Sequence, residues 1–166
     1  MWYDANWLVQ QQSGRSCLVH AMTNYFAPGN INVPVGGIRD LGQVVPLLDR
    51  MARTEGKVVK NTHQHCADLQ QCVEWLGEKN RTRTLLHVKL PTTNTRSNNS
   101  KANHFCVLKL SKAGEAFVWD SWKKDGGNLN VKSVPKDKYD LQFGFDCITF
   151  DLCENHGKPD VCELSD

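Results

Sequence analysis

Apolar residues in the first half of the chain recur at three- and four-residue intervals in three segments, a spacing that predicts amphipathic helices. Pro46 interrupts the second segment, where we expect a break in the helix, and Gly56 is expected to cap its C-terminal end. The predicted helices are Leu18–Phe26, Ile38–Glu55 and Asp68–Leu76.

Short runs of mainly apolar residues dominate the second half of the chain and predict strands. The short link Ser111–Gly114 indicates a hairpin between two of them. Val58 and Val59 are expected to add only a short extended piece. The predicted strands are Thr84–Leu90, His104–Leu110, Glu115–Trp119, Asn130–Val134 and Phe145–Leu152.

Helices first and antiparallel strands afterwards predict an α+β fold, in which the N-terminal helices pack on an antiparallel β-sheet. The chain has 166 residues, a length that suits one domain with a sizeable core. No internal repeat or linker divides it. We therefore expect a single domain over residues 1–166, with a cleft where the helices meet the sheet.

Composition and charge exclude several classes of function. Hydrophobic residues make up 40% of the chain and the net charge is +2, so no nucleic-acid-binding surface is expected. The basic clusters Lys79–Arg83 and Lys136–Lys138 are interpreted as solvated loops. No apolar run approaches the ~18 residues needed to span a bilayer, and the first residues lack a signal-peptide pattern. We expect a cytoplasmic protein, with the nucleus as a second compartment, that is monomeric and binds neither nucleic acid nor membrane.

Seven cysteines, an odd number without a dense framework, are interpreted as reduced. Four ligand-type residues near the C-terminal end lack the close spacing of structural zinc sites: Cys147, Cys153, His156 and Cys162. The segment His63–Cys66 also carries ligand-type side chains, but it is interpreted as a solvated loop that leads into a helix. We expect no metal and no cofactor.

One of the cysteines, Cys17, stands where a nucleophile would be activated. A turn containing Gly14 leads into the first predicted helix, so the thiol lies at the start of that helix. A free thiol titrates near ~8.5, and a helix N-terminus together with an imidazolium lowers that pKa. His104, at the start of a predicted strand, is the expected base, and Asp120, at the end of the next strand, would orient its ring.

Other interpretations of these residues stay open. Cys17 fits a small buried apolar residue, His104 a structural histidine and Asp120 a turn residue. His20 is a rival base because it follows Cys17 by three residues, but a base on the same turn would have poor geometry for a substrate between them. Gln12, five residues before the thiol, is expected to donate to the oxyanion together with the Cys17 backbone N–H. Gln10 and Gln11 are rivals for that role.

These segments resemble a known family. The run from Gln12 to Asn24, with Gln five residues before the cysteine and His three after it, resembles the nucleophile segment of Josephin domains. His104–Leu110 and Phe117–Ser121 resemble the strands that carry the family's base and its third catalytic residue. Phe143–Phe150 resembles the family's closing strand.

Josephin domains are papain-like cysteine proteases that remove ubiquitin. The resemblance implies hydrolysis of an isopeptide or peptide bond after the C-terminal glycine of ubiquitin or a ubiquitin-like protein. It assigns Cys17 as nucleophile, His104 as base, Asp120 as the third catalytic residue and Gln12 as oxyanion donor. A papain-like peptidase of other specificity, such as one that processes a viral polyprotein, and an inactive binding module on the same scaffold are the alternatives.

Overall fold

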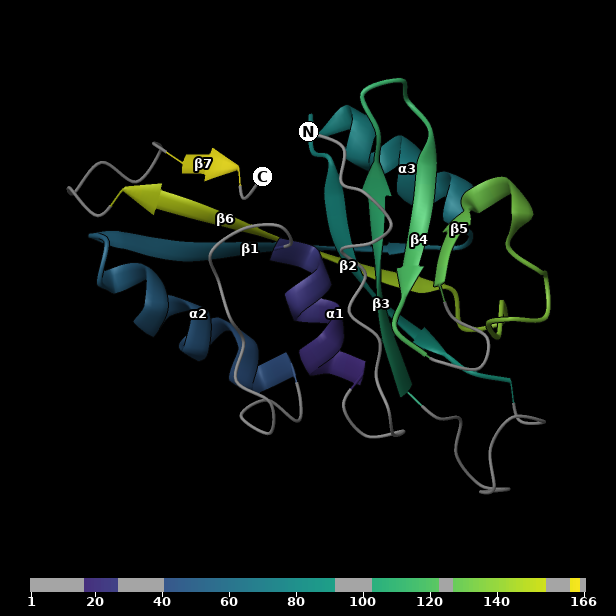
Figure 1. Ribbon diagram of the computed structural model, residues 1–166, viewed down its shortest axis with the longest axis horizontal. Helices are drawn as coiled ribbons and strands as arrows, with labels where there is room; N and C mark the ends of the chain where they lie inside the picture. Colours follow the sequence, from purple (N-terminus) through teal and green to yellow (C-terminus); the bar gives the residue numbers. More distant parts are fainter. Residues whose placement is uncertain (1–16, 27–40, 92–102, 123–126, 155–161, 165–166) are drawn as a thin grey trace.

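The computed structural model describes residues 17–26, 41–91, 103–122, 127–154 and 162–164 (Figure 1). The predicted α+β class is confirmed: helices pack against an antiparallel sheet. None of the described helices is long and apolar enough to cross a membrane. In chain order the elements are α1 (Cys17–Phe26), η2 (Leu41–Gln43), α2 (Val44–Arg53), β1 (Lys57–Cys66), α3 (Leu69–Glu78), β2 (Arg83–Lys89), β3 (Asn103–Leu110), β4 (Ala116–Asp120), β5 (Gly127–Asn130), η4 (Val131–Ser133), β6 (Phe145–Glu154) and β7 (Cys162–Leu164).

The described strands form one seven-stranded sheet in the order β1-β6-β2-β3-β4-β5, with β7 paired to β6. Every pairing is antiparallel. β1 and β6 pair over their whole lengths, from Lys57 opposite Glu154 to Cys66 opposite Phe145. β3, which carries His104, lies between β2 and β4 and is therefore an interior strand.

Helices cover both faces of this sheet, as Figure 1 shows for α1 and α3. On β3, Phe105 and Val107 face the cluster formed with α1 and α2, while Cys106 and Leu108 face the cluster formed with α3. Strands buried on both faces need apolar residues at successive positions rather than strict alternation. This explains why mainly apolar runs such as His104–Leu110 correctly predicted strands.

Helix α1 is fixed to the sheet through its buried face. Leu18, Met22 and Tyr25 recur at helical spacing and are at most 3% exposed. The Tyr25 hydroxyl accepts a 3.0 Å hydrogen bond from the Phe150 backbone N–H of β6, and the two rings meet edge to face at 5.4 Å. Packing and this bond together set the position of the helix N-terminus, where Cys17 lies.

The predicted break at Pro46 is wrong. Pro46 is the third residue of α2, and the first turn of a helix has no intrahelical partner for its N–H groups, so proline costs little there. The helix ends at Arg53, with Thr54 as its C-cap. Gly56 then adopts φ +69°, a left-handed conformation that suits glycine, and the chain turns into β1.

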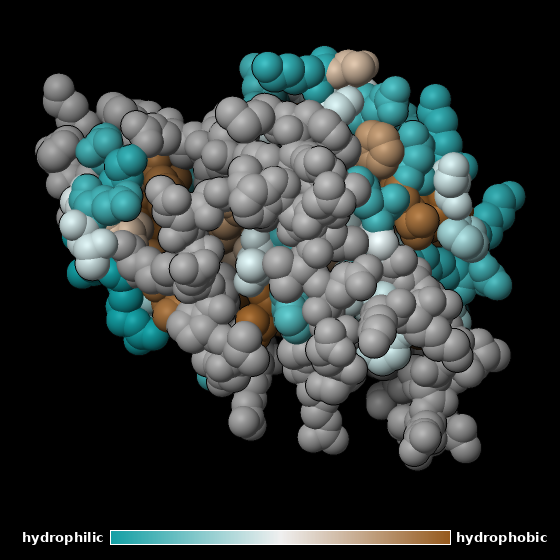
Figure 2. All heavy atoms as spheres, viewed as in Figure 1, coloured by the Kyte–Doolittle hydropathy of each residue, from teal (hydrophilic) through white to brown (hydrophobic). Residues whose placement is uncertain are grey.

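Two predictions about the strands need correction. The region from Val58 to His65 belongs to a ten-residue strand, β1, so the loop predicted for His63–Cys66 is wrong. The strand predicted at Asn130–Val134 lies earlier, at β5, and a short 3-10 helix, η4, follows it. On the face seen in Figure 2, the visible hydrophobic side chains of the described residues form small separate areas.

Candidate active site

Cys17 is the first residue of α1 and is half-buried. Burial raises the pKa of its thiol, but a hydrogen bond and the positive charge of His104 act in the opposite direction. The backbone N–H groups of Phe105 and Leu18 also hydrogen-bond the sulfur, and the net effect lowers the pKa below its ordinary value. The sulfur is thus stabilised as a thiolate.

His104 is the second residue of β3 and is 2% exposed. Its Nε2 lies 2.8 Å from Asp120 Oδ1, so Nδ1 is the nitrogen left for Cys17. Burial lowers the pKa of the ring, yet the hydrogen bonds and charges of Asp120 and Cys17 raise it to about 9. The ring is therefore an imidazolium at neutral pH. It lies beside the Cys17 thiol, whose pKa is lowered.

Asp120 ends β4 and is buried, with acceptor contacts to both carboxylate oxygens. Oδ1 accepts from His104 and, at 2.9 Å, from the Trp122 backbone N–H. Oδ2 accepts from the Tyr139 hydroxyl at 2.7 Å and lies 3.7 Å from Lys138 Nζ. Burial raises the pKa of this carboxyl, but the hydrogen bond and charge of His104, with the hydrogen bonds from Trp122 and Tyr139, lower it overall. The buried carboxylate is therefore ionised, and each of its two oxygens has hydrogen-bond or ion-pair partners.

The register of the β3–β4 hairpin explains why His104 and Asp120 meet. Val107 lies opposite Trp119, and extending that pairing by three residues places His104 opposite Trp122. Asp120 is then the diagonal neighbour of His104 on the same face of the sheet, within reach of a long side chain. The Trp122 ring meets the His104 ring edge to face at 6.4 Å.

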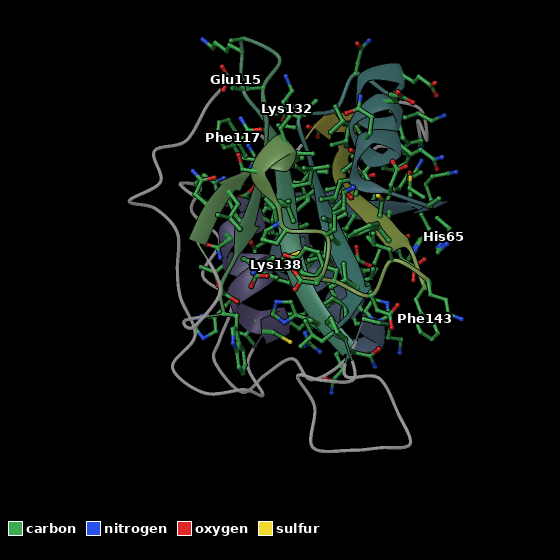
Figure 3. The ribbon with its side chains drawn as sticks, turned by 90° about the vertical axis from the view of Figure 1, so that its right-hand side faces the viewer. His65, Glu115, Phe117, Lys132, Lys138 and Phe143 are labelled. Carbon is green, nitrogen blue, oxygen red and sulfur yellow. The ribbon has the colours of Figure 1, made fainter. Side chains whose placement is uncertain are left out.

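Lys138 and Tyr139 contact the Asp120 carboxylate, and the sequence pattern did not predict either contact. Lys138 was interpreted as part of a solvated loop, but its side chain is only 8% exposed beside Asp120. Figure 3 shows Lys138 over the sheet rather than at the rim of the molecule. The signal in the sequence is the aromatic Tyr139 between two charged residues, because a ring in a polar stretch is often buried against the core.

His20 and three glutamines are the remaining candidates from the sequence. His20 is half-buried on α1, and burial lowers the pKa of its ring. Among the described residues, the imidazole that bonds the Cys17 thiol is that of His104. Gln10, Gln11 and Gln12 lie outside the described residues, so the expected oxyanion donor stays a prediction.

Accessibility also separates Cys17 from the other thiols. Of the five free cysteines in the described part of the chain, four are buried and Cys17 alone is half-exposed. A nucleophile must be reachable by its substrate, which favours Cys17. Cys153 is disulfide-bonded, so the expectation that all seven cysteines are reduced is wrong for this residue. In the backbone register, Cys153 of β6 lies opposite Cys162 of β7.

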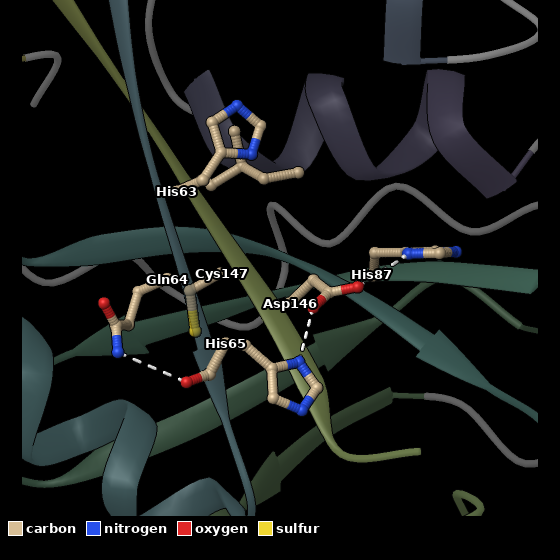
Figure 4. Close-up of a pocket in the computed structure, with 7 residues that line it drawn as sticks. His63, Gln64, His65, His87, Asp146 and Cys147 are labelled. Atoms are coloured by element: carbon tan, nitrogen blue, oxygen red, sulfur yellow. Dashed lines mark hydrogen bonds and ion pairs between the residues drawn. The ribbon is translucent and has the colours of Figure 1, made fainter.

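A second polar cluster lines a pocket formed by β1, β6 and β2 (Figure 4). Asp146 lies 2.6 Å from His65 Nδ1 and 3.3 Å from His87 Nδ1, and His87 Nε2 lies 3.0 Å from Asn103 Oδ1. Burial raises the pKa of Asp146, but the two histidines lower it overall. Because β1 pairs with β6, the predicted loop histidine His65 instead belongs to this network.

Comparison with known proteins does not assign the chain to a family. No protein-family model matches the chain, and no curated protein matches it in sequence. The resemblance to Josephin domains therefore stays a prediction.

Proposed function

We propose that this protein is a cysteine-type peptidase with Cys17 as nucleophile, His104 as acid and base, and Asp120 as the residue that orients His104. The observation that carries the proposal is the continuous chain of contacts from the Cys17 sulfur through the His104 ring to the Asp120 carboxylate. It joins the one half-exposed free thiol among the described residues to a buried, charged imidazole.

The chemistry follows from these positions. The Cys17 thiolate attacks the carbonyl carbon of the scissile bond, and the oxygen takes up the negative charge. His104 then gives its proton to the leaving amine as the C–N bond breaks, which leaves a thioester on Cys17. Water attacks the thioester while His104 takes one of its protons, the C–S bond breaks, and the acid product leaves as the Cys17 thiolate and the His104 imidazolium are restored. Asp120 holds the ring in one orientation through both steps.

The substrate class we propose is a polypeptide tail ending in glycine, as in ubiquitin or a ubiquitin-like protein. The support is the resemblance of the Cys17, His104 and Asp120 segments to Josephin domains. A monomeric enzyme of the cytoplasm or nucleus is part of the same proposal. Cleavage of a peptide library without preference for a Gly-Gly tail would instead favour a peptidase of other specificity.

The decisive experiment uses ubiquitin with an electrophilic group at its C-terminus. We expect one covalent adduct per chain, located on Cys17 by mass spectrometry and absent in Cys17→Ala. Cys72→Ala, which removes an equally buried thiol on α3, away from the proposed site, is the matched control and should form the adduct normally. A folded protein that forms no adduct, and whose Cys17 alkylates no faster than an ordinary thiol at neutral pH, would be an inactive scaffold.

A further inference from the structure

Three buried thiols from three different elements meet on the face of the sheet that α3 covers. Cys66 ends β1, Cys72 lies on α3 and Cys147 lies on β6. They are 4%, 0% and 0% exposed, and their sulfur atoms all lie within 4.8 Å of one another. None of them takes part in the proposed peptidase chemistry.

The local structure brings the three sulfurs together in a defined way. Cys66 lies opposite Phe145 in the β1–β6 register, so Cys147 is its diagonal neighbour on the same face. The chain then enters α3 at once, where the Asp68 side chain caps the helix by accepting from the Gln71 N–H at 2.8 Å. Cys72 consequently lies in the first turns of α3, above the two strand cysteines.

The size of the cluster fits one metal ion. Zinc–sulfur bonds are about 2.3 Å long, so three sulfurs that share an ion lie about 3.8–4.0 Å apart. Sulfurs within 4.8 Å of one another reach that spacing by moving less than about 1 Å each. Hydrogen bonds already join Cys72 to Cys147 and both to Cys66, which shows that the side chains point toward a common centre.

The surroundings select the kind of ion. Trp75, Leu76 and Leu86 belong to the apolar cluster that encloses the thiols, so the site is dry. The donor atoms are sulfurs, which are soft ligands. Thiolates prefer ions such as Zn²⁺ and Cu⁺. Three thiolates around a divalent ion leave a net charge of about −1, against about −2 around a monovalent ion, and the smaller buried charge is less costly.

We propose that Cys66, Cys72 and Cys147 form a binding site for a thiophilic divalent metal ion of the zinc type, which links β1, β6 and α3. This replaces the expectation from sequence that the chain binds no metal. Each thiol releases one proton to solvent as its bond to the metal forms. The Thr84 hydroxyl also contacts Cys147, but it hydrogen-bonds the backbone carbonyls of Leu85 and Ile148, so the three thiols are the ligands proposed here. The role is structural, because the site is closed and buried.

The test uses the whole chain carrying Cys17→Ala, so that metal bound by Cys17 and His104 does not contribute. The reduced protein is titrated with Zn²⁺ against a chromophoric chelator, and with Co²⁺ to record the absorption of cobalt–thiolate bonds. We expect one ion per chain, the cobalt–thiolate absorption and a higher unfolding temperature with Zn²⁺. Because this background is inactive by design, the outcome is independent of the peptidase proposal.

Variants assign the site. Cys72→Ser and Cys147→Ser should each weaken Zn²⁺ binding by more than about 100-fold, since loss of a second-shell partner alone costs 10–100-fold. Cys106→Ser is the matched control. Cys106 is equally buried in the same apolar cluster but does not belong to the group of three thiols, so the variant should bind as the parent does.

Three results would overturn the proposal: no stoichiometric ion in the folded parent, a disulfide between two of the cluster thiols in the freshly purified protein, or equal loss of binding in Cys106→Ser. The first two are measured on the parent chain and do not require that any cysteine variant folds. Tighter binding of Cu⁺ than of Zn²⁺, measured by the same competition, would overturn the choice of a divalent ion.

Discussion

Replacing Asp120 by Asn tests whether the carboxylate maintains the charged state of the site. The substitution keeps the shape of the side chain and removes its charge. His104 has a pKa raised from 6.5 to about 9 in spite of its burial, a net stabilisation of the imidazolium of about 3 kcal/mol at ~1.36 kcal/mol per pKa unit. Asp120 contributes at least as much to this rise as Cys17 does, both by hydrogen bonding and by charge.

The asparagine oxygen can still accept the hydrogen bond from His104, but it carries no charge. The pKa of His104 in Asp120→Asn should therefore fall by about 1 unit. The ratio of the thiolate–imidazolium pair to the neutral pair then falls by about 10-fold. His104 loses its proton as pH rises through its pKa, so the basic limb of the activity profile should move to lower pH.

The assay is the rate of Cys17 alkylation by iodoacetate between about pH 5 and pH 10, with the modified residue identified by mass spectrometry. The His104 imidazolium attracts this anion, so the rate falls on the basic side as His104 loses its proton. Asp146→Asn is the matched control, because it makes the same chemical change beside two histidines, His65 and His87, outside the proposed site. The control should keep the profile of the unmodified protein. A folded Asp120→Asn protein with an unchanged basic limb would refute the assigned role of the carboxylate.

Three further predictions concern the site and the core. Tyr139→Phe removes a hydrogen bond to the Asp120 carboxylate, and calorimetry should show a loss of about 1.5–3 kcal/mol in unfolding free energy, with slower Cys17 alkylation at neutral pH. Lys109 is buried, and its burial, with the charge of a neighbouring arginine, lowers its pKa to about 6. From about pH 6 to pH 10 the unfolded chain therefore binds more protons than the folded one, and the free energy of unfolding rises with pH. In denaturation experiments, the free energy of unfolding of Lys109→Met should depend less on pH in that window. At pH 7 it should be about 2–4 kcal/mol higher than that of the unmodified protein. At Gly144, φ is +65° and an added Cβ would lie 2.6 Å from a backbone oxygen of β1, so Gly144→Ala should destabilise the fold by more than about 1 kcal/mol. Gly77→Ala, on an open helix surface, should instead be neutral or stabilising by up to about 1 kcal/mol. Equal denaturation midpoints for the two alanine variants would contradict this reasoning.

The sequence predicted the elements whose local pattern agrees with their final environment. Leu18–Phe26 has the spacing of a one-sided helix and lies as α1 on the sheet. The link Ser111–Gly114 predicted a hairpin, and Gly114 adopts φ +83° in that turn. The hairpin then determines the register of β3 and β4. The pairing of His104 with Asp120 could therefore be predicted, because the two residues belong to one hairpin and are only 16 positions apart in sequence.

Features that depend on distant parts of the chain escaped prediction. β1 is an edge strand whose side chains are mostly half-buried or exposed, so it lacks the apolar run of an interior strand. Its partner β6 lies some eighty or more residues later, and no local signal records that pairing. The burial of Lys138 escaped prediction for another reason: no hairpin register joins it to Asp120, whose carboxylate lies 3.7 Å from its Nζ.

The two halves of the proposed site differ in what holds them. The His104–Asp120 pair depends on one hairpin, supported by Tyr139 and the backbone N–H of Trp122, and is buried among its partners. The Cys17 sulfur is brought to that pair by the packing of a ten-residue helix against β2, β3 and β6. A helix of this length is marginal by itself, so tertiary contacts must supply its stability. The geometry at His104 is consequently set mainly by short-range register, whereas the distance from the sulfur to the ring is set by the core. Substitutions in the core under α1 should therefore change the reactivity of the Cys17 thiol more than they change the geometry of the His104–Asp120 pair.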